Sequence, residues 1–209
     1  MVLKPEKFPE KDKPQPRIGH TQGANSETTT RSEAVRSIYT HLVSEIRQVY
    51  EQNEEAFKNI RQIRHRLIGI HTLAELVGVL VNDLKELNVD HVSLLLADDL
   101  EGIEVILSAD LPQDIGRHLL LVDRKSLANV FQSLGGVAVH IGAKGEIDKL
   151  SLWADDILSG VLAPLEFRGR LIGCICLGAG SSQRFVADHS PDLLEDLAVT
   201  TAICLANTL

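Results

Sequence analysis

Cysteines are scarce in this sequence, and so are long apolar runs. The 209 residues include three cysteines, an odd and small number that argues against the disulfide framework of a small secreted domain. No apolar run approaches the ~20 residues needed to cross a bilayer. The N-terminal stretch MVLKPEKFPEKDKPQPRIG is charged and rich in proline, unlike a signal peptide. We therefore expect a cytoplasmic protein that does not contact a membrane.

Positive charge is also scarce in the C-terminal two thirds of the chain. Residues 72–209 contain 9 Lys and Arg against 20 Asp and Glu, a net charge of −11, whereas residues 1–71 contain 12 against 9, a net charge of +3. The whole chain therefore carries −8. Proteins bind polyanions by neutralising phosphates with clustered Lys and Arg. The acidic C-terminal part thus argues against nucleic acid as a partner.

The first 71 residues divide into two segments. Residues 1–30 have almost no large apolar side chains, so they cannot bury enough surface to offset the entropy of ordering, and we expect a disordered tail. Residues 31–71 carry apolar residues at alternating steps of three and four, which predicts a coiled-coil dimerisation helix. The alternative is an amphipathic helix that folds onto its own domain. The candidate dimerisation residues are Ile46, Val49, Asn53, Ile60, Ile63 and Leu67.

Asn53 indicates how two such helices would pair. It occupies an a position in an otherwise apolar seam. A polar amide there costs stability, but it can pair with its twin across a parallel two-stranded coiled coil. We therefore expect a parallel homodimer through the N-terminal helix.

Residues 72–209 read as one α+β domain. Thr72 and Glu75 form a T-x-x-E capping box that predicts a helix ending near Asn88. Two strands are then expected within 89–109, a short helix capped by Asp123, a strand near residue 140, a hairpin with its turn at Arg168 and Gly169, and a closing helix after Ser190 and Pro191. This order does not alternate strand and helix, so it favours an antiparallel sheet with helices packed on one face.

Two stretches of this region resemble a known family. GVLAPLEFRGRLIGCICLG followed by RFVADHSPDLLEDLA resembles the closing half of a GAF domain, and the capped helix with VDHVSLLLADD resembles the opening half. A heptad helix joined to one such domain is similar to an uncharacterised family of short bacterial GAF-like proteins. The resemblance implies a GAF-like antiparallel sheet that can hold a small ligand. It also implies an alternative activity, because GAF-fold methionine sulfoxide reductases use loop cysteines.

Cys174 and Cys176 decide how far the enzyme alternative can be taken. They share one face of a strand whose two faces are both apolar, as expected of a strand covered on both sides. Two cysteines at i and i+2 on an extended strand pair poorly, and a zinc site would need a second ligand pair. We interpret both as buried small apolar residues and predict neither a metal site nor catalytic residues.

The function expected from the sequence is a non-catalytic, dimeric, GAF-like sensory or scaffolding module. It would bind a small molecule or a partner protein and transmit its state through the coiled coil to an unidentified output protein. The alternatives are a thiol enzyme such as a methionine sulfoxide reductase, or a purely structural dimeriser without a ligand. The sequence names no cofactor. The candidate pocket residues are His140, Trp153, Asp155 and Asp156.

Overall fold

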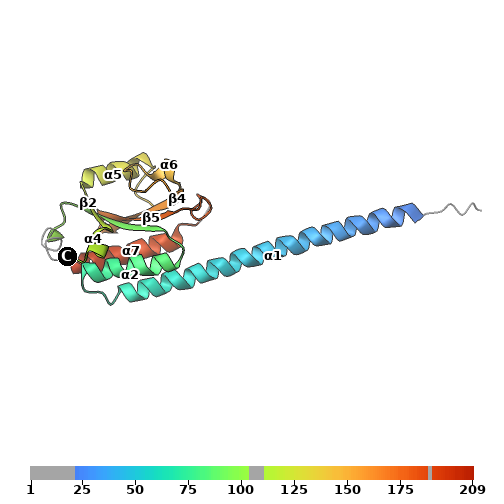
Figure 1. Cartoon of the computed structure of the whole chain (residues 1–209), viewed down its shortest axis with the longest axis horizontal. Helices are drawn as coiled ribbons and strands as arrows, with labels where there is room; N and C mark the ends of the chain where they lie inside the picture. The colour runs from blue at the N-terminus through green and yellow to red at the C-terminus, as the bar shows by residue number, and fades with distance from the viewer. Residues whose placement is uncertain (1–21, 104–110, 188–189) are drawn as a thin grey trace, which may run out of the picture. The chain divides into compact units, whose positions relative to one another are not determined.

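The computed structural model describes residues 22–103, 111–187 and 190–209 (Figure 1). The chain divides into two units, Met1–Glu51 and Gln52–Leu209. The sequence placed this boundary at residue 71. In the structure the boundary lies after Glu51, because the last third of the N-terminal helix belongs to the core of the second unit, as shown below.

Helix α1 spans Gln22–Leu67. It therefore begins inside the segment for which we expected disorder, while residues 1–21 of that segment lie outside the described residues. Side chains of α1 are described from residue 36 onward, except at residues 46, 48–50, 52 and 53. No proline occurs between residues 17 and 111, which is compatible with one uninterrupted helix, because an internal proline would remove a hydrogen bond and clash with the preceding turn.

A five-stranded sheet forms the middle layer of the second unit, in the order β2-β1-β5-β4-β3. Three of its four pairings are antiparallel, but β1 and β2 run parallel. The sheet is therefore mixed, whereas we had expected it to be antiparallel throughout. The strand predicted after the 98–102 turn falls on residues 104–110, outside the described residues. The strands are β1 (His91–Ala97), β2 (Leu119–Val122), β3 (His140–Ala143), β4 (Ser159–Phe167) and β5 (Arg170–Ala179).

The hairpin between β4 and β5 confirms the turn expected from the sequence. Arg168 and Gly169 have φ values of 53° and 73°. Two consecutive left-handed residues form the turn whose twist matches that of the flanking strands. The hairpin brings Leu162 opposite Cys176 and Pro164 opposite Cys174, which fixes the face that each cysteine presents.

One face of the sheet is covered by α2 (Leu73–Glu86) and α7 (Asp192–Thr208). The Thr72 hydroxyl oxygen accepts a hydrogen bond from the backbone N–H of Glu75 at 3.2 Å, so the predicted capping box is present. Asn88 ends this helix with a φ of 59°, again as expected. Leu76, Leu80 and Leu84 point inward and are at most 2% exposed. Together with α7 and the sheet they form the larger apolar core.

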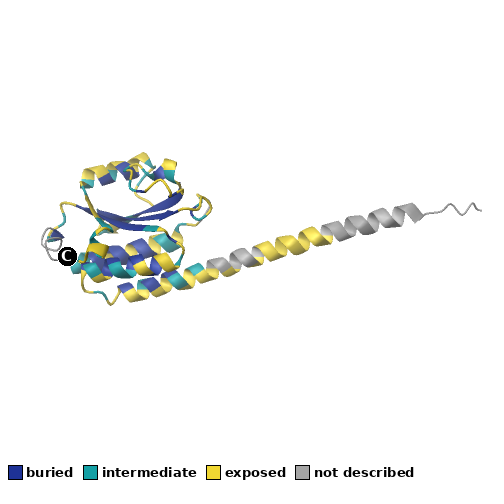
Figure 2. Cartoon of the chain, in the orientation of Figure 1, coloured by how far each residue is buried: buried dark blue, intermediate teal, exposed yellow. Residues whose placement is uncertain are grey.

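Shorter helices cover the opposite face, so the expectation of helices on one face only is wrong. Figure 1 shows α5 (Arg124–Ser133) and α6 (Lys144–Ile147) across the sheet from α2 and α7, while the one-turn helix α4 (Gln113–Gly116) contacts α2. A second apolar core lies beneath α5 and α6, around Phe131 and Trp153. Both faces of β5 are therefore buried, which explains its almost unbroken apolar sequence (Figure 2).

Candidate functional site

Trp153 was expected to line a ligand pocket, but it lies in the second apolar core. Its side chain is 4% exposed and packs against β4 and β5. A Cβ atom added to Gly160 would come within 2.5 Å of the indole ring, and one added to Gly178 would come within 3.3 Å of it. The two glycines therefore allow the ring to lie directly on the strands. The indole Nε1 is buried without a hydrogen-bond partner.

His140 lies on β3 at the edge of the sheet. Its Nε2 is 2.9 Å from the Gly136 carbonyl oxygen, and its ring centroid is 5.9 Å from that of Phe131. These contacts occupy the side chain with the loop before β3 and with the end of α5. His140 thus packs against a loop and a helix of the second core.

Asp155 and Asp156 are exposed. The Asp155 carboxylate lies 3.6 Å from the Lys144 ammonium, and that ammonium also donates a hydrogen bond to the Ala154 carbonyl oxygen at 2.8 Å. His140 and Asp155 therefore make their polar contacts with different groups, the Gly136 carbonyl oxygen and the Lys144 ammonium, while Trp153 lies in the second core.

The cysteines are buried in both cores. Cys174 and Cys176 are at most 1% exposed, with their sulfur atoms 3.7 Å apart, and Cys204 is 6% exposed on α7. Burial raises the pKa of the Cys174 thiol well above its usual range, and it also raises that of Cys204. A reactive thiolate needs solvent access and a positive environment, and these positions supply neither.

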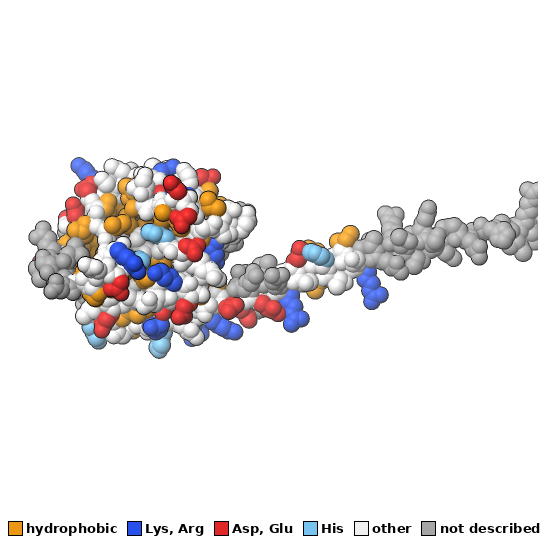
Figure 3. Space-filling view, viewed as in Figure 1, with side chains coloured by type: hydrophobic (Ala, Val, Ile, Leu, Met, Phe, Trp, Pro, Cys, Tyr) orange, Lys and Arg blue, Asp and Glu red, His pale blue; other side chains and the backbone are white. Residues whose placement is uncertain are grey.

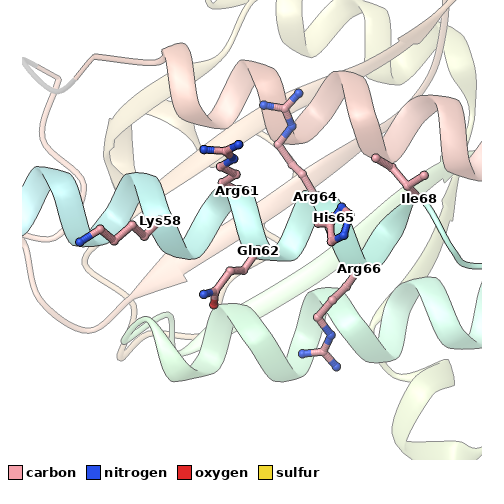
Figure 4. A pocket seen from close by; sticks show the side chains of 7 residues that line it. All are labelled: Lys58, Arg61, Gln62, Arg64, His65, Arg66 and Ile68. Atoms are coloured by element: carbon pink, nitrogen blue, oxygen red, sulfur yellow. The ribbon is translucent and has the colours of Figure 1, made fainter.

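An open depression with a volume of about 700 Å³ runs along the outer surface of the end of α1 (Figure 4). Every residue that lines it comes from the last turns of α1 or follows them directly. One helix cannot form opposing walls, so we read this feature as an exposed helix surface and not as a ligand cavity. The lining residues are Lys58, Arg61, Gln62, Arg64, His65, Arg66 and Ile68.

The inward side of the same helix segment is part of the larger core. Ile60, Ile63 and Leu67 are 6%, 3% and 0% exposed, and they pack with residues of α2 and α7. These three predicted dimerisation residues are therefore occupied within their own chain and are not available to a second helix. The alternative of a helix folded onto its own domain holds for this part of α1. The side chains of Ile46, Val49 and Asn53 lie outside the described residues.

Two arginines attach this segment to the helices beneath it. Arg64 donates hydrogen bonds to the Asp196 carboxylate at 2.6 Å and to the Thr200 hydroxyl at 3.0 Å, both on α7. Arg66 contacts the Asp83 carboxylate of α2 at 2.5 Å. Burial nevertheless raises the pKa of Asp83, since the removal of water outweighs the attraction of Arg66, whose own side chain remains exposed to solvent.

The earlier part of α1 carries a different feature. Ile38, Tyr39, Leu42 and Val43 are 66%, 66%, 50% and 59% exposed within the single chain. Tyr39 and Leu42 belong to the heptad pattern, whereas Ile38 and Val43 flank it and were not predicted. Their spacing places all four on one side of the helix. We call these four residues the upstream stripe.

Among the described residues, no group of three or more His, Cys, Asp or Glu side chains is placed to hold a metal ion. No helix in that part of the chain is both long and apolar enough to span a bilayer. On the face shown in Figure 3, Lys and Arg side chains lie among Asp and Glu side chains over the second unit.

Comparison with solved structures finds proteins similar in fold to this chain. The GAF domain of an Acinetobacter phosphoenolpyruvate-protein phosphotransferase is similar to it in fold, with 14% sequence identity and a TM-score of 0.49. The match covers 71% of this chain and 91% of that one. So distant a likeness says nothing of ligand or activity. No protein-family model matches the sequence, and no curated protein matches it either.

Proposed function

We propose that this protein is a non-catalytic, dimeric, GAF-like scaffolding module whose N-terminal helices pair through the upstream stripe. The observation that carries the proposal is the exposure of Ile38, Tyr39, Leu42 and Val43, each at least half exposed in the single chain. An isolated helix cannot bury such a stripe against itself. The heptad spacing is the pattern that a second helix covers in a coiled coil.

The packing of the end of α1 supports a role in transmission. In the proposed dimer, the upstream part of α1 pairs with a second copy of the chain. The last turns of the same helix pack into the core of their own domain through Ile60, Ile63 and Leu67. The Leu67 carbonyl oxygen accepts a hydrogen bond from the Cys204 thiol of α7 at 3.2 Å. A partner that shifts α2 or α7 would therefore act directly on α1. The shift it causes is limited by its difference in affinity for the two arrangements.

A small-molecule ligand is the second candidate, and one observation favours it. The Trp153 Nε1 donor is buried without a partner, and such groups are rare because an unmet donor costs about 1–3 kcal/mol. A ligand with an acceptor atom could reach it if the loop of residues 148–158 moved. Native mass spectrometry of the purified full chain tests this directly. A mass above that of the polypeptide assembly would reveal a retained ligand, and a mass equal to it under mild ionisation would favour the scaffold.

The thiol-enzyme alternative has weaker support. Burial keeps all three cysteines away from solvent, and it raises the pKa of the Cys174 and Cys204 thiols, which favours their protonated form. Methionine sulfoxide turnover that disappears in a Cys174→Ser or Cys176→Ser variant would establish the enzyme and overturn the scaffold.

Sedimentation of the full chain over a dilution series tests the dimer. We expect a dimer whose dissociation constant rises about tenfold or more in Leu42→Glu, because a charge would enter the helix seam. Val137→Glu is the matched control, since Val137 is 42% exposed outside α1. A monomeric wild-type chain throughout the series would refute the proposed dimer, as would an unchanged dissociation constant in Leu42→Glu.

A further inference from the structure

The outer surface of the second unit carries a second exposed apolar group, where the end of α1 runs beside α7. Arg64 contacts Asp196 and Thr200, and three residues later the Leu67 carbonyl contacts Cys204. Residue numbers thus increase together along both helices, so the two run in the same direction. Successive residues of α1 therefore lie beside successive residues of α7. We call the position along these parallel helix axes the height.

The apolar residues of this surface are Ile68, Val199 and Ile203. They are 70%, 57% and 47% exposed. Val199 and Ile203 are one turn apart on α7 and adjoin Thr200 and Cys204, which contact α1. Ile68 follows Leu67, and Figure 4 shows its side chain on the side of α7. Exposed branched apolar residues grouped in this way mark an interaction surface more often than isolated ones do.

The charges beside this group are separated by helix. Arg61 is exposed on α1 and points toward the α7 side in Figure 4, one turn before Arg64. Asp192 and Glu195 are exposed in the first turn of α7, about one turn before the residues that Arg64 contacts. Basic charge on α1 therefore lies at about the same height as acidic charge on α7. We call the six residues Arg61, Ile68, Asp192, Glu195, Val199 and Ile203 the α1–α7 face.

We propose that the α1–α7 face docks onto the same face of a second copy of this chain. A twofold axis parallel to the two helices preserves height and exchanges their positions, so α1 of one copy faces α7 of the other. Basic charge then meets acidic charge, and the apolar groups meet each other. The face is therefore self-complementary in charge and in hydropathy. An acidic or a basic partner would match only one of its two helices, so a second copy of the chain fits the face better.

This inference rests on the proposed dimer and adds a second contact to it. A parallel coiled coil, the arrangement that Asn53 indicates, is likewise generated by a twofold axis parallel to its helices. The two contacts use different residues, so variants can separate them. Arg64 and Asp196, which hold α1 to α7 within one chain, are left unchanged in every variant.

The principal test measures dimer dissociation in the full chain carrying Val199→Ser and Ile203→Ser together. We expect the dissociation constant to rise about tenfold, since burial at the centre of an interface contributes most to affinity. The control carries Val137→Ser and Leu158→Ser, two similarly exposed apolar residues outside this face, and should match the wild type. Fluorescence of Trp153, the only tryptophan, verifies that each variant is folded.

Charge reversal tests the arrangement within the face. Arg61→Glu and Glu195→Arg should each weaken the dimer at low salt, and their combination should restore it. At high salt the differences should shrink, because exposed charges are screened. Single variants that equal the wild type, or a combination weaker than either, would contradict the exchange of α1 and α7.

Cross-linking between separately labelled copies provides an independent measurement. Ile68→Cys on one copy and Val199→Cys on the other should join through a short bis-maleimide, whereas Leu158→Cys paired with Val199→Cys should not. The native cysteines are buried and will react slowly. A monomeric wild type would overturn this inference together with the proposed dimer. A wild-type dimer that is weakened by Leu42→Glu but unaffected by the paired serine substitutions would overturn this inference alone.

Discussion

Leu42 and Leu67 belong to the same heptad pattern on the same helix, yet the structure places them in opposite environments. Leu42 is 50% exposed in the single chain, whereas Leu67 is 0% exposed between α2 and α7. A heptad pattern shows that a stripe must be buried, but it does not show by what. The upstream stripe of α1 is exposed in the single chain, and the stripe near its end is covered by its own chain. Figure 2 shows the corresponding change from exposed to buried along the described part of α1.

The largest expected difference is in the free energy of unfolding. Leu67→Ala should lower it by about 2–5 kcal/mol, the usual cost of a cavity at a fully buried leucine. Leu42→Ala should change the unfolding of the second unit by less than about 0.5 kcal/mol, as expected at an exposed site. Urea titration followed by Trp153 fluorescence measures both. Equal effects of the two substitutions would abolish the distinction between the two parts of α1.

Cysteine reactivity should reveal the same difference locally. Cys204 and the fully buried Leu67 side chain belong to the same core, so the cavity left by Leu67→Ala should speed alkylation of Cys204 in the native protein about tenfold or more. Leu42→Ala should leave that rate unchanged. Mass spectrometry of peptides after timed labelling measures each site. Rapid labelling of Cys174 or Cys176 in the wild type would contradict their placement in the second core.

The start of α2 offers a smaller effect. Thr72→Ala removes the hydroxyl that accepts from the Glu75 N–H, and it should lower the free energy of unfolding by about 1 kcal/mol. Thr72→Ser retains the acceptor and is the matched control. The end of α1 packs on the helix that this cap begins, so the loss should appear in the unfolding of the second unit. A Thr72→Ala variant as stable as Thr72→Ser would show that the cap does not contribute.

The smallest effect concerns the ion pair between Arg66 and Asp83. Asp83 has a raised pKa in the folded state, so its contribution to stability should fall as the pH rises through the window just above its ordinary value of 3.8. Asp83→Asn cannot ionise and should not show this loss. We expect a difference of less than about 1 kcal/mol at neutral pH that shifts in favour of the variant as the pH rises. Urea titrations at several pH values measure it, and a shift toward the wild type would show that attraction to Arg66 outweighs the cost of burial.

Local chemistry was sufficient to predict most of the individual elements. The Thr72 cap, the left-handed Asn88, the Asp123 cap and the turn at Arg168 and Gly169 were each expected and are each present. These features depend on residues close together in the chain, so sequence patterns report them well. The burial of Cys174 and Cys176 followed in the same way, because a strand that is apolar on both faces must be covered on both faces.

Long-range packing was what the sequence could not supply. No local signal shows that β2 pairs parallel to β1, that Trp153 lies in the second apolar core, or that the heptad residues Ile60, Ile63 and Leu67 turn toward α2 and α7. The exposure of Val199 and Ile203 is equally invisible in an apolar helix sequence. The sequence by itself determined which residues must be hidden and which turns must form, since both follow from local hydropathy and backbone preference. Only the tertiary structure decided what hides them, because burial is a contact between segments distant in the chain.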